Sequence, residues 1–212
     1  LEILNSFMRA LSNYEFNYPV HLKIDSGMHR LGFDRAEISS LIEGIKNNDK
    51  IKVQSIFSHL VASDAAEHDG FTQHQIDHFK MVADQLVMAL GYKPLLHIAN
   101  TSGISRWPNG QMDMVRLGIG LYGFDSALFQ NRGLQTVMVL KTTVTQVKVL
   151  EAGETVGYSR RGIMPQGGRI ATVKIGYADG YSRAFGNGIG KMIVNGHLVP
   201  TIGSICMDMT ML

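Results

Sequence analysis

The sequence contains little cysteine, no long apolar run and little net charge, and each of these features excludes a class of protein. Cys206 is the only cysteine in the 212 residues, so no internal disulfide can form and a reducing cytoplasm is the expected compartment. No apolar run approaches the ~18 residues of a membrane span, and no signal-peptide pattern opens the chain. The net charge is +2 without a strip of Lys and Arg, which gives no indication of nucleic-acid binding. With 45% hydrophobic residues, the sequence predicts a globular protein with no membrane or nucleic-acid partner.

Both ends of the sequence lie inside patterned segments. The opening residues "LEILNSFMRAL" are typical of a helix that is already under way at Leu1. The apolar run "ICMDMTML" stops at Leu212. We therefore expect the chain to be part of a longer protein.

The first half of the chain alternates segments typical of strands with segments typical of helices. Strands are expected at residues 19–25, 51–60, 95–100 and 114–123, and helices at 34–48 and 69–91. Asp34 with Glu37 predicts a capped helix start, and Gly91 predicts a helix end. Alternating strands and helices favour parallel βα units. They fit either a Rossmann-like sheet or half of a (β/α)₈ barrel, because a closed barrel needs ~250 residues.

Helical patterns end near residue 127. Strands are expected in "TVTQVKVL" (143–150), "RIATVKIGYADG" (169–180), "KMIVNGHLVPTIG" (191–203) and "SICMDMTML". The "IVNGHL" stretch is a strong signal for a β-hairpin. The sequence therefore predicts two domains, an α/β domain at 1–126 and a mainly-β domain at 127–212.

Polar side chains recur where the predicted strands of the first half end. Lys23 lies near the end of the first strand and Arg30 follows it. His59 lies near the end of the second strand, Thr101 follows the third and Arg116 lies in the fourth. In parallel α/β folds the ligands bind at the carboxyl ends of the strands. Repetition over several strands favours a binding site over isolated structural hydrogen bonds, and the glycines that follow Arg116 suit a phosphate.

Several other residues have a structural interpretation. His74 and His78 have the spacing of zinc ligands but lie off the apolar stripe of their helix, so we interpret them as a solvated face and predict no metal site. Met207, Met209 and Met211 look like core filler by composition, and Cys206 like a buried residue. Tyr158 is ambiguous: neighbouring arginines would favour its phenolate, whereas the local sequence also fits a surface turn.

In order, these segments resemble the pyridoxal-phosphate (PLP) dependent alanine racemases. The matching stretches are "HLKIDSGMHRLGF", "FSHLVASD", "HIANTSG", "DMVRLGIGLYG", "GETVGYSRRG", "KIGYADGYSR" and "GSICMDM". The resemblance implies the C-terminal half of a (β/α)₈ TIM-type barrel followed by most of a mainly-β domain. It also implies a cytoplasmic isomerase that supplies D-alanine for peptidoglycan.

The resemblance assigns the cofactor residues. Arg116 would face the pyridine nitrogen of PLP, and His59 would support Arg116 from behind. An arginine leaves that nitrogen unprotonated, which suits racemisation and disfavours transamination. Thr101 would bind the phosphate through its hydroxyl, and Gly118 and Ile119 would bind it through their backbone.

The resemblance also assigns the groups that act on alanine. Tyr158 would be the base on one face of Cα, and the lysine that forms the Schiff base with PLP would be the base on the other face. Arg30 would orient Tyr158 and reach the substrate carboxylate, to which Met207 would donate its backbone N–H. Lys23 matches a lysine that is often carbamylated, whose new negative charge would hold Arg30.

Further implications concern access and assembly. The residues that match the substrate entrance are Tyr177 and Asp208. Family tyrosines of this kind act on the cofactor of the partner subunit, so the resemblance implies a homodimer with shared active sites.

The chain departs from the family pattern in two respects, one of which is that it lacks the C-terminal tyrosine that completes the family's phosphate site. The Schiff-base lysine belongs to an early barrel motif that these 212 residues do not contain, so we expect the chain alone to be inactive. Two alternatives stay open: another barrel-type PLP enzyme, such as a serine or broad-specificity racemase or a decarboxylase, and a PLP-binding protein without catalysis. Arg116 speaks against a decarboxylase, because those relatives place an acid at the pyridine nitrogen.

Overall fold

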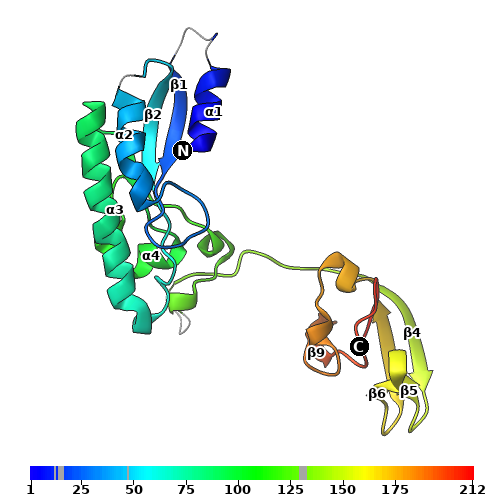
Figure 1. Cartoon of the computed structure of the whole chain (residues 1–212). Coiled ribbons are helices and arrows are strands. Elements are labelled where there is room, and N and C mark those ends of the chain that lie inside the picture. Colours follow the sequence, from blue (N-terminus) through cyan, green and yellow to red (C-terminus); the bar gives the residue numbers. More distant parts are fainter. Residues whose placement is uncertain (12, 14–16, 47, 129–132) are drawn as a thin grey trace. The chain divides into compact units, whose positions relative to one another are not determined.

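The computed structural model describes the chain except for residues 12, 14–16, 47 and 129–132. The chain divides into two compact units, Leu1–Met138 and Val139–Leu212, and each is described by itself (Figure 1). The domain boundary at residues 126 and 127 remains a prediction. Within the described residues, no helix has the length and apolar character needed to cross a membrane.

The first unit alternates strands and helices in the predicted order. Its strands and α-helices are α1 (Glu2–Ala10), β1 (Tyr18–Lys23), α2 (Ile38–Lys46), β2 (Ile51–Phe57), α3 (Asp69–Leu90), β3 (Leu95–His97) and α4 (Thr101–Arg106). Short 3₁₀ helices at Arg35–Glu37, Ala66–His68, Pro108–Gly110, Ile119–Tyr122 and Ser126–Leu128 complete it. The strands are shorter than predicted, because each gives way to a loop at its carboxyl end.

The three strands form one parallel sheet in the order β1-β2-β3. Ile51, Val53 and Ile56 of the central strand are buried, and α2 and α3 lie beside the sheet (Figure 1). The predicted helical stripes supply the other side of the core: Ile38, Leu41, Ile45, Ile76, Phe79, Ala83 and Leu86. Since the strands are parallel, their carboxyl ends meet at one edge of the sheet.

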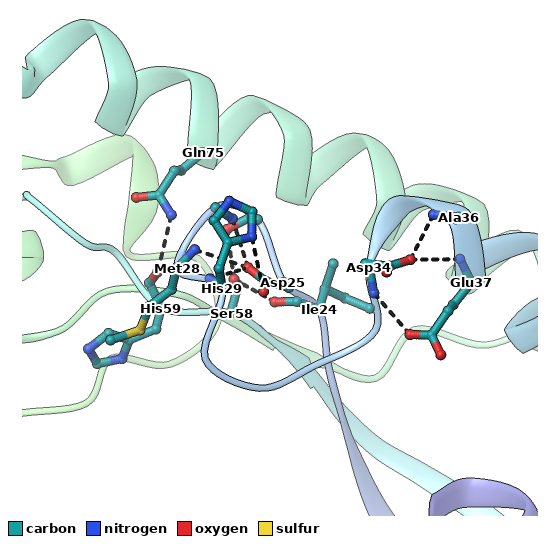
Figure 2. Close-up of polar contacts among 12 residues, drawn as sticks. Ile24, Asp25, Met28, His29, Asp34, Ala36, Glu37, Ser58, His59 and Gln75 are labelled. Atoms are coloured by element: carbon teal, nitrogen blue, oxygen red, sulfur yellow. Dashed lines mark hydrogen bonds and ion pairs between the residues drawn. The ribbon is translucent and has the colours of Figure 1, made fainter. Parts of the chain in front are cut away.

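The predicted signals for the ends of the helices are confirmed. The Asp34 carboxylate accepts hydrogen bonds from the backbone N–H groups of Ala36 (2.9 Å) and Glu37 (3.0 Å). The Glu37 side chain accepts one from Asp34 N–H (3.2 Å), which completes the capping box in Figure 2. Helix α3 ends at Gly91, whose φ of 72° lies in the left-handed region that glycine adopts without strain.

The strand predicted at residues 114–123 is wrong. Backbone N–H groups of Asp113 and Arg116 donate to Leu96 O and Ala99 O (3.1 Å each), so the segment follows the third strand only briefly. The chain then leaves this direction at Gly118 and forms the 3₁₀ helix Ile119–Tyr122. Alternating glycine and apolar residues imitate the period of a strand, but the glycines allow the turn that ends it.

The second unit is built from strands, and no α-helix follows Arg106 in the described part of the chain. Its strands are β4 (Val144–Leu150), β5 (Thr155–Val156), β6 (Gly162–Ile163), β7 (Gly168–Val173), β8 (Lys191–Val194), β9 (His197–Pro200) and β10 (Thr210–Met211). They form an antiparallel sheet β10-β7-β4 and the pairs β5-β6 and β8-β9. In the last pair, Asn195 (φ 49°) and Gly196 (φ 82°) form the predicted turn.

The predicted strand at "SICMDMTML" is mostly a loop, and two of its methionines are not core residues in this unit. Only Thr210–Met211 forms a strand. The backbone carbonyls of Cys206 and Met207 instead accept hydrogen bonds from Tyr177 N (3.0 Å) and Ala178 N (2.8 Å). This arrangement leaves Met207 59% and Met209 40% exposed, and Cys206 is half-buried rather than buried.

Candidate active site

A pocket of about 450 Å³ in the first unit collects five of the predicted cofactor residues. They are His59, Thr101, Arg116, Gly118 and Ile119. His59 follows β2, and Thr101 and Arg116 follow β3, so the pocket lies at the carboxyl edge of the parallel sheet. Ligands of parallel α/β folds bind at this edge.

Arg116 projects a cation into this pocket from a half-buried position. Its Nη2 donates to the carbonyl oxygens of Ser58 and Ile98, the latter at 3.2 Å. Burial lowers the pKa of the guanidinium from its usual value. Its Nε–H is buried and has no acceptor among the described residues. An unused buried donor fits a hydrogen-bond acceptor on a ligand, since a buried polar group without a partner is costly.

The turn after Arg116 surrounds the hydroxyl of Thr101. The backbone N–H groups of Gly118 and Gly120 both donate to Thr101 Oγ1 at 3.1 Å. A Cβ at Gly120 would lie 2.7 Å from Thr101 Cγ2, so only glycine permits this close approach. The Thr101 hydroxyl at the start of α4 and the glycine turn therefore lie against each other. A hydroxyl beside a glycine-rich turn is the kind of cradle that holds phosphate oxygens.

Positive charges act on His59, which lines the pocket together with Arg116. The pKa of His59 is lowered by burial and then by the positive charges of Arg116, Arg30 and Lys23. Burial, Arg30 and Arg116 also lower the pKa of Lys23, although the carboxylate of Asp25 opposes them. Such a cluster favours an anionic ligand and favours the neutral amine at Lys23.

The loop between β1 and Arg30 is ordered by Asp25. Its Oδ1 accepts hydrogen bonds from the backbone N–H groups of Gly27 (2.9 Å), Met28 (3.0 Å) and His29 (3.1 Å), as Figure 2 shows. Burial raises the pKa of this carboxyl, but the three hydrogen bonds and the nearby His29 lower it below its usual value. Asp25 therefore fixes the backbone that leads to Arg30.

The second unit brings together three further predicted residues. Tyr158, Tyr177 and Met207 line a pocket of about 360 Å³ with Arg183 and Ile205. The Arg183 guanidinium lies 5.7 Å from the centre of the Tyr177 ring. Tyr158 is 71% exposed, and Asp208, next to Met207, is also exposed.

The backbone after Tyr158 is strained. Ser159 and Arg160 have φ values of 56° and 54°, which non-glycine residues rarely adopt. Two such residues in succession after a candidate base favour a functional turn over an ordinary surface turn, because strain of this kind gathers at functional sites.

Several groups in contact with the site residues were not predicted from the sequence. His97 is buried and its ring stacks on Phe57, while Phe57 contacts Arg116 and Arg183 contacts Tyr177. His97 carried a usable signal, a polar residue in an otherwise apolar strand.

The rings of His74 and His78 stack 6.4 Å apart, and no group of three or more metal-ligating side chains could hold a metal ion within the described residues.

The fold and the two pockets define the class of this protein, namely a barrel-type α/β domain with a pocket suited to a phosphorylated ligand, followed by a mainly-β domain. Family models assign the same two parts: the alanine racemase N-terminal domain matches residues 1–126 and the C-terminal domain matches residues 137–212. The chain belongs to the alanine racemase family, and its fold is the C-terminal half of the family's barrel followed by its β domain.

Individual relatives agree. The chain is 35% identical to the alanine racemase of Fusobacterium nucleatum over 97% of this chain and 56% of the relative. It is 37% identical to that of Aeromonas hydrophila over 96% of this chain and 56% of the relative. The chain therefore spans about half the length of the curated relatives it matches.

Solved structures give the same result. Alanine racemase from Bartonella henselae, described with covalently bound pyridoxal phosphate, matches with a TM-score of 0.82 and 30% identity over 99% of this chain and 56% of that one. The Streptomyces coelicolor alanine racemase matches with a TM-score of 0.88 and 26% identity over 100% of this chain and 57% of that one.

Proposed function

We propose that the protein is a PLP-dependent alanine racemase, an isomerase that interconverts L-alanine and D-alanine. The observation that carries this proposal is the buried Nε–H of Arg116, a donor without an acceptor among the described residues. The names of the relatives and the PLP bound to the Bartonella henselae protein support the same reaction. The relatives do not favour the serine racemase, decarboxylase or non-catalytic alternatives.

Arg116 and the turn that follows it would hold the cofactor. The Nε–H of Arg116 would donate to the pyridine nitrogen, while Thr101, Gly118 and Ile119 would hold the phosphate, and His59 would support Arg116. When bound, PLP supplies an electron sink that acidifies the Cα–H of the amino acid. Arginine, which stays protonated, would keep the pyridine nitrogen unprotonated and so favour the return of the proton to Cα.

The remaining predicted residues would bind alanine and move its proton. Tyr158 would remove or return the Cα proton on one face, opposite the family's cofactor lysine. Arg30 would orient Tyr158 and bind the substrate carboxylate, with help from the backbone N–H of Met207. Lys23 is a candidate for carbamylation because its lowered pKa favours the nucleophilic neutral amine.

The proposal extends to assembly and cellular role. The predicted cofactor residues belong to the first unit, whereas Tyr158 belongs to the second unit with Tyr177 and Asp208 of the predicted entrance. We propose that they meet across a homodimer, with domains at 1–126 and 127–212. The enzyme would act in the cytoplasm and supply D-alanine for the cell wall.

Isotope exchange in the intact protein tests the role of Tyr158. With Tyr158→Ala, uptake of deuterium at Cα from D₂O should collapse for L-alanine, because this face has lost its base. D-alanine should still exchange through the lysine without completing inversion. NMR of the recovered alanine measures both rates. Tyr181→Phe, a tyrosine change elsewhere in the second unit, should exchange both enantiomers normally; undiminished exchange in Tyr158→Ala would refute the assignment.

A further inference from the structure

A chain of hydrogen bonds crosses the sheet of the first unit. The hydroxyl oxygen of Ser55 lies 2.6 Å from Nδ1 of His21 and 3.1 Å from Nε2 of His97. The three residues come from β1, β2 and β3, and the parallel register pairs His21 with Ser55. Ser55 is 1% and His97 5% exposed, whereas His21 is exposed. These hydrogen bonds therefore connect the buried imidazole of His97 to the surface of the unit.

The number of available protons determines which group donates and which accepts in each of these hydrogen bonds. Ser55 has one hydroxyl proton, so it donates to one histidine and accepts from the other. If it donated to His97 Nε2, the proton of neutral His97 would sit on Nδ1, which is buried without a partner among the described residues. Buried N–H groups without acceptors are rarer than unpaired acceptors. The favoured order is thus His97 Nε2–H to Ser55, and Ser55 O–H to His21 Nδ1.

The electrostatic surroundings keep His97 neutral, as this order requires. Burial lowers the pKa of His97 to about 4, with further contributions from the charges of Arg116 and His21. A neutral imidazole can carry its proton on Nε2 and donate it to Ser55.

His97 in turn contacts the surroundings of Arg116. The rings of His97 and Phe57 stack with centres 5.0 Å apart and planes 10° apart. The Arg116 guanidinium carbon lies 5.4 Å from the centre of the same Phe57 ring. Arg116 also donates to the carbonyl of Ile98, the residue directly after His97. The position of the His97 ring therefore affects Arg116 both through Phe57 and through the backbone.

We propose that His21 and Ser55 are positioning residues that fix His97 in the Nε2–H tautomer, and that His97 in this state holds Phe57 and Arg116 in the orientation that leaves Arg116 Nε free for the cofactor. The inference rests on the proposed function for the meaning of Arg116, but the tautomer itself does not depend on it.

Selective ¹⁵N-histidine NMR of the intact protein without added cofactor tests the tautomer. His97 should show a protonated Nε2 and an unprotonated Nδ1 in the wild type. His21→Asn keeps an acceptor near the place of Nδ1 and should retain this pattern, whereas His21→Leu and Ser55→Ala should lose it. A protonated Nδ1 in the wild type, or the same tautomer in all variants, overturns the proposal.

Titration with PLP tests the effect on Arg116. His21→Leu and Ser55→Ala should bind PLP on the order of tenfold more weakly, because each substitution leaves a buried polar group of the network without its hydrogen-bond partner. The His97 ring would then no longer hold Arg116 in its orientation. His21→Asn should recover most of the affinity, and His197→Leu, an exposed histidine on β9, should equal the wild type. Equal affinity in all variants refutes the link to Arg116. A wild-type protein that binds no PLP refutes the proposed function. In that case the NMR measurement of the His97 tautomer still tests the proposed role of His21 and Ser55, because it needs no cofactor.

Discussion

Arg116 combines a role expected in cofactor binding with a position that is unfavourable for the stability of the fold. Its guanidinium is half-buried and satisfies two backbone carbonyls, yet one of its donors has no partner in the described structure. Burial of a cation with an unpaired donor is unfavourable unless a ligand completes it. The free-energy cost of this unpaired donor in the unliganded protein therefore supports a ligand that accepts a hydrogen bond from Arg116.

Replacing Arg116 with Glu tests its effect on the course of the reaction. A carboxyl group at the pyridine nitrogen would favour its protonation, so racemisation should fall strongly and transamination should rise. The ratio of pyruvate formed to alanine racemised, measured in the intact enzyme, should increase. Arg169→Glu makes the same charge change at an exposed site and should leave the ratio unchanged. An unchanged ratio in Arg116→Glu would refute the pyridine assignment.

His97 should make stability depend on pH. Its pKa is about 4 in the folded protein and near 6.5 when unfolded, so the unfolded state binds more protons between these values. The free energy of unfolding should therefore fall as the pH drops from 6.5 towards 4, by up to roughly 3 kcal/mol. Urea unfolding across this range should show a shallower loss in His97→Gln than in the wild type, and parallel curves would contradict the role of His97.

At the scale of elements, helix signals in the sequence were more reliable than strand signals. The capping pair Asp34 and Glu37 and the terminal Gly91 act through the local backbone, so sequence determines them almost alone. The segment 114–123 has the apolar composition of a strand, but its path depends on hydrogen bonds to Leu96 and Ala99 and on Thr101. These partners are distant in sequence, so periodicity could not predict the turn.

Two glycine substitutions distinguish an effect on PLP binding at the turn after Arg116 from an effect on the stability of a helix. Gly120→Ala would place a Cβ 2.7 Å from side-chain atoms of Thr101 and Leu117, which must move. PLP affinity should fall on the order of tenfold. Gly44→Ala lies in α2 with open space around its Cβ and should raise stability by about 0.5–1 kcal/mol without changing affinity. PLP titration and thermal unfolding measure both effects; normal affinity in Gly120→Ala would contradict the cradle.

At the scale of the whole molecule, the expected homodimer can be tested by complementation. A Tyr158→Phe variant of the intact protein and a variant that lacks the cofactor lysine should each be nearly inactive. After subunit exchange, mixed dimers should regain racemase activity, because one of their two sites would then contain both bases. Lack of activity despite exchange confirmed by mass spectrometry, or a strictly monomeric protein in sedimentation, would refute shared sites.

The sequence by itself determined the alternation of strands and helices, the helix caps, the hairpin at Asn195 and the family, because these depend on local backbone preferences and on the order of motifs. Only the tertiary structure decided the turn at Gly118, the exposed Met207 and the partners of His97. The physical reason is the same in each case. Long-range hydrogen bonds and burial bring together residues that lie far apart in the chain, and no local pattern records which groups will meet.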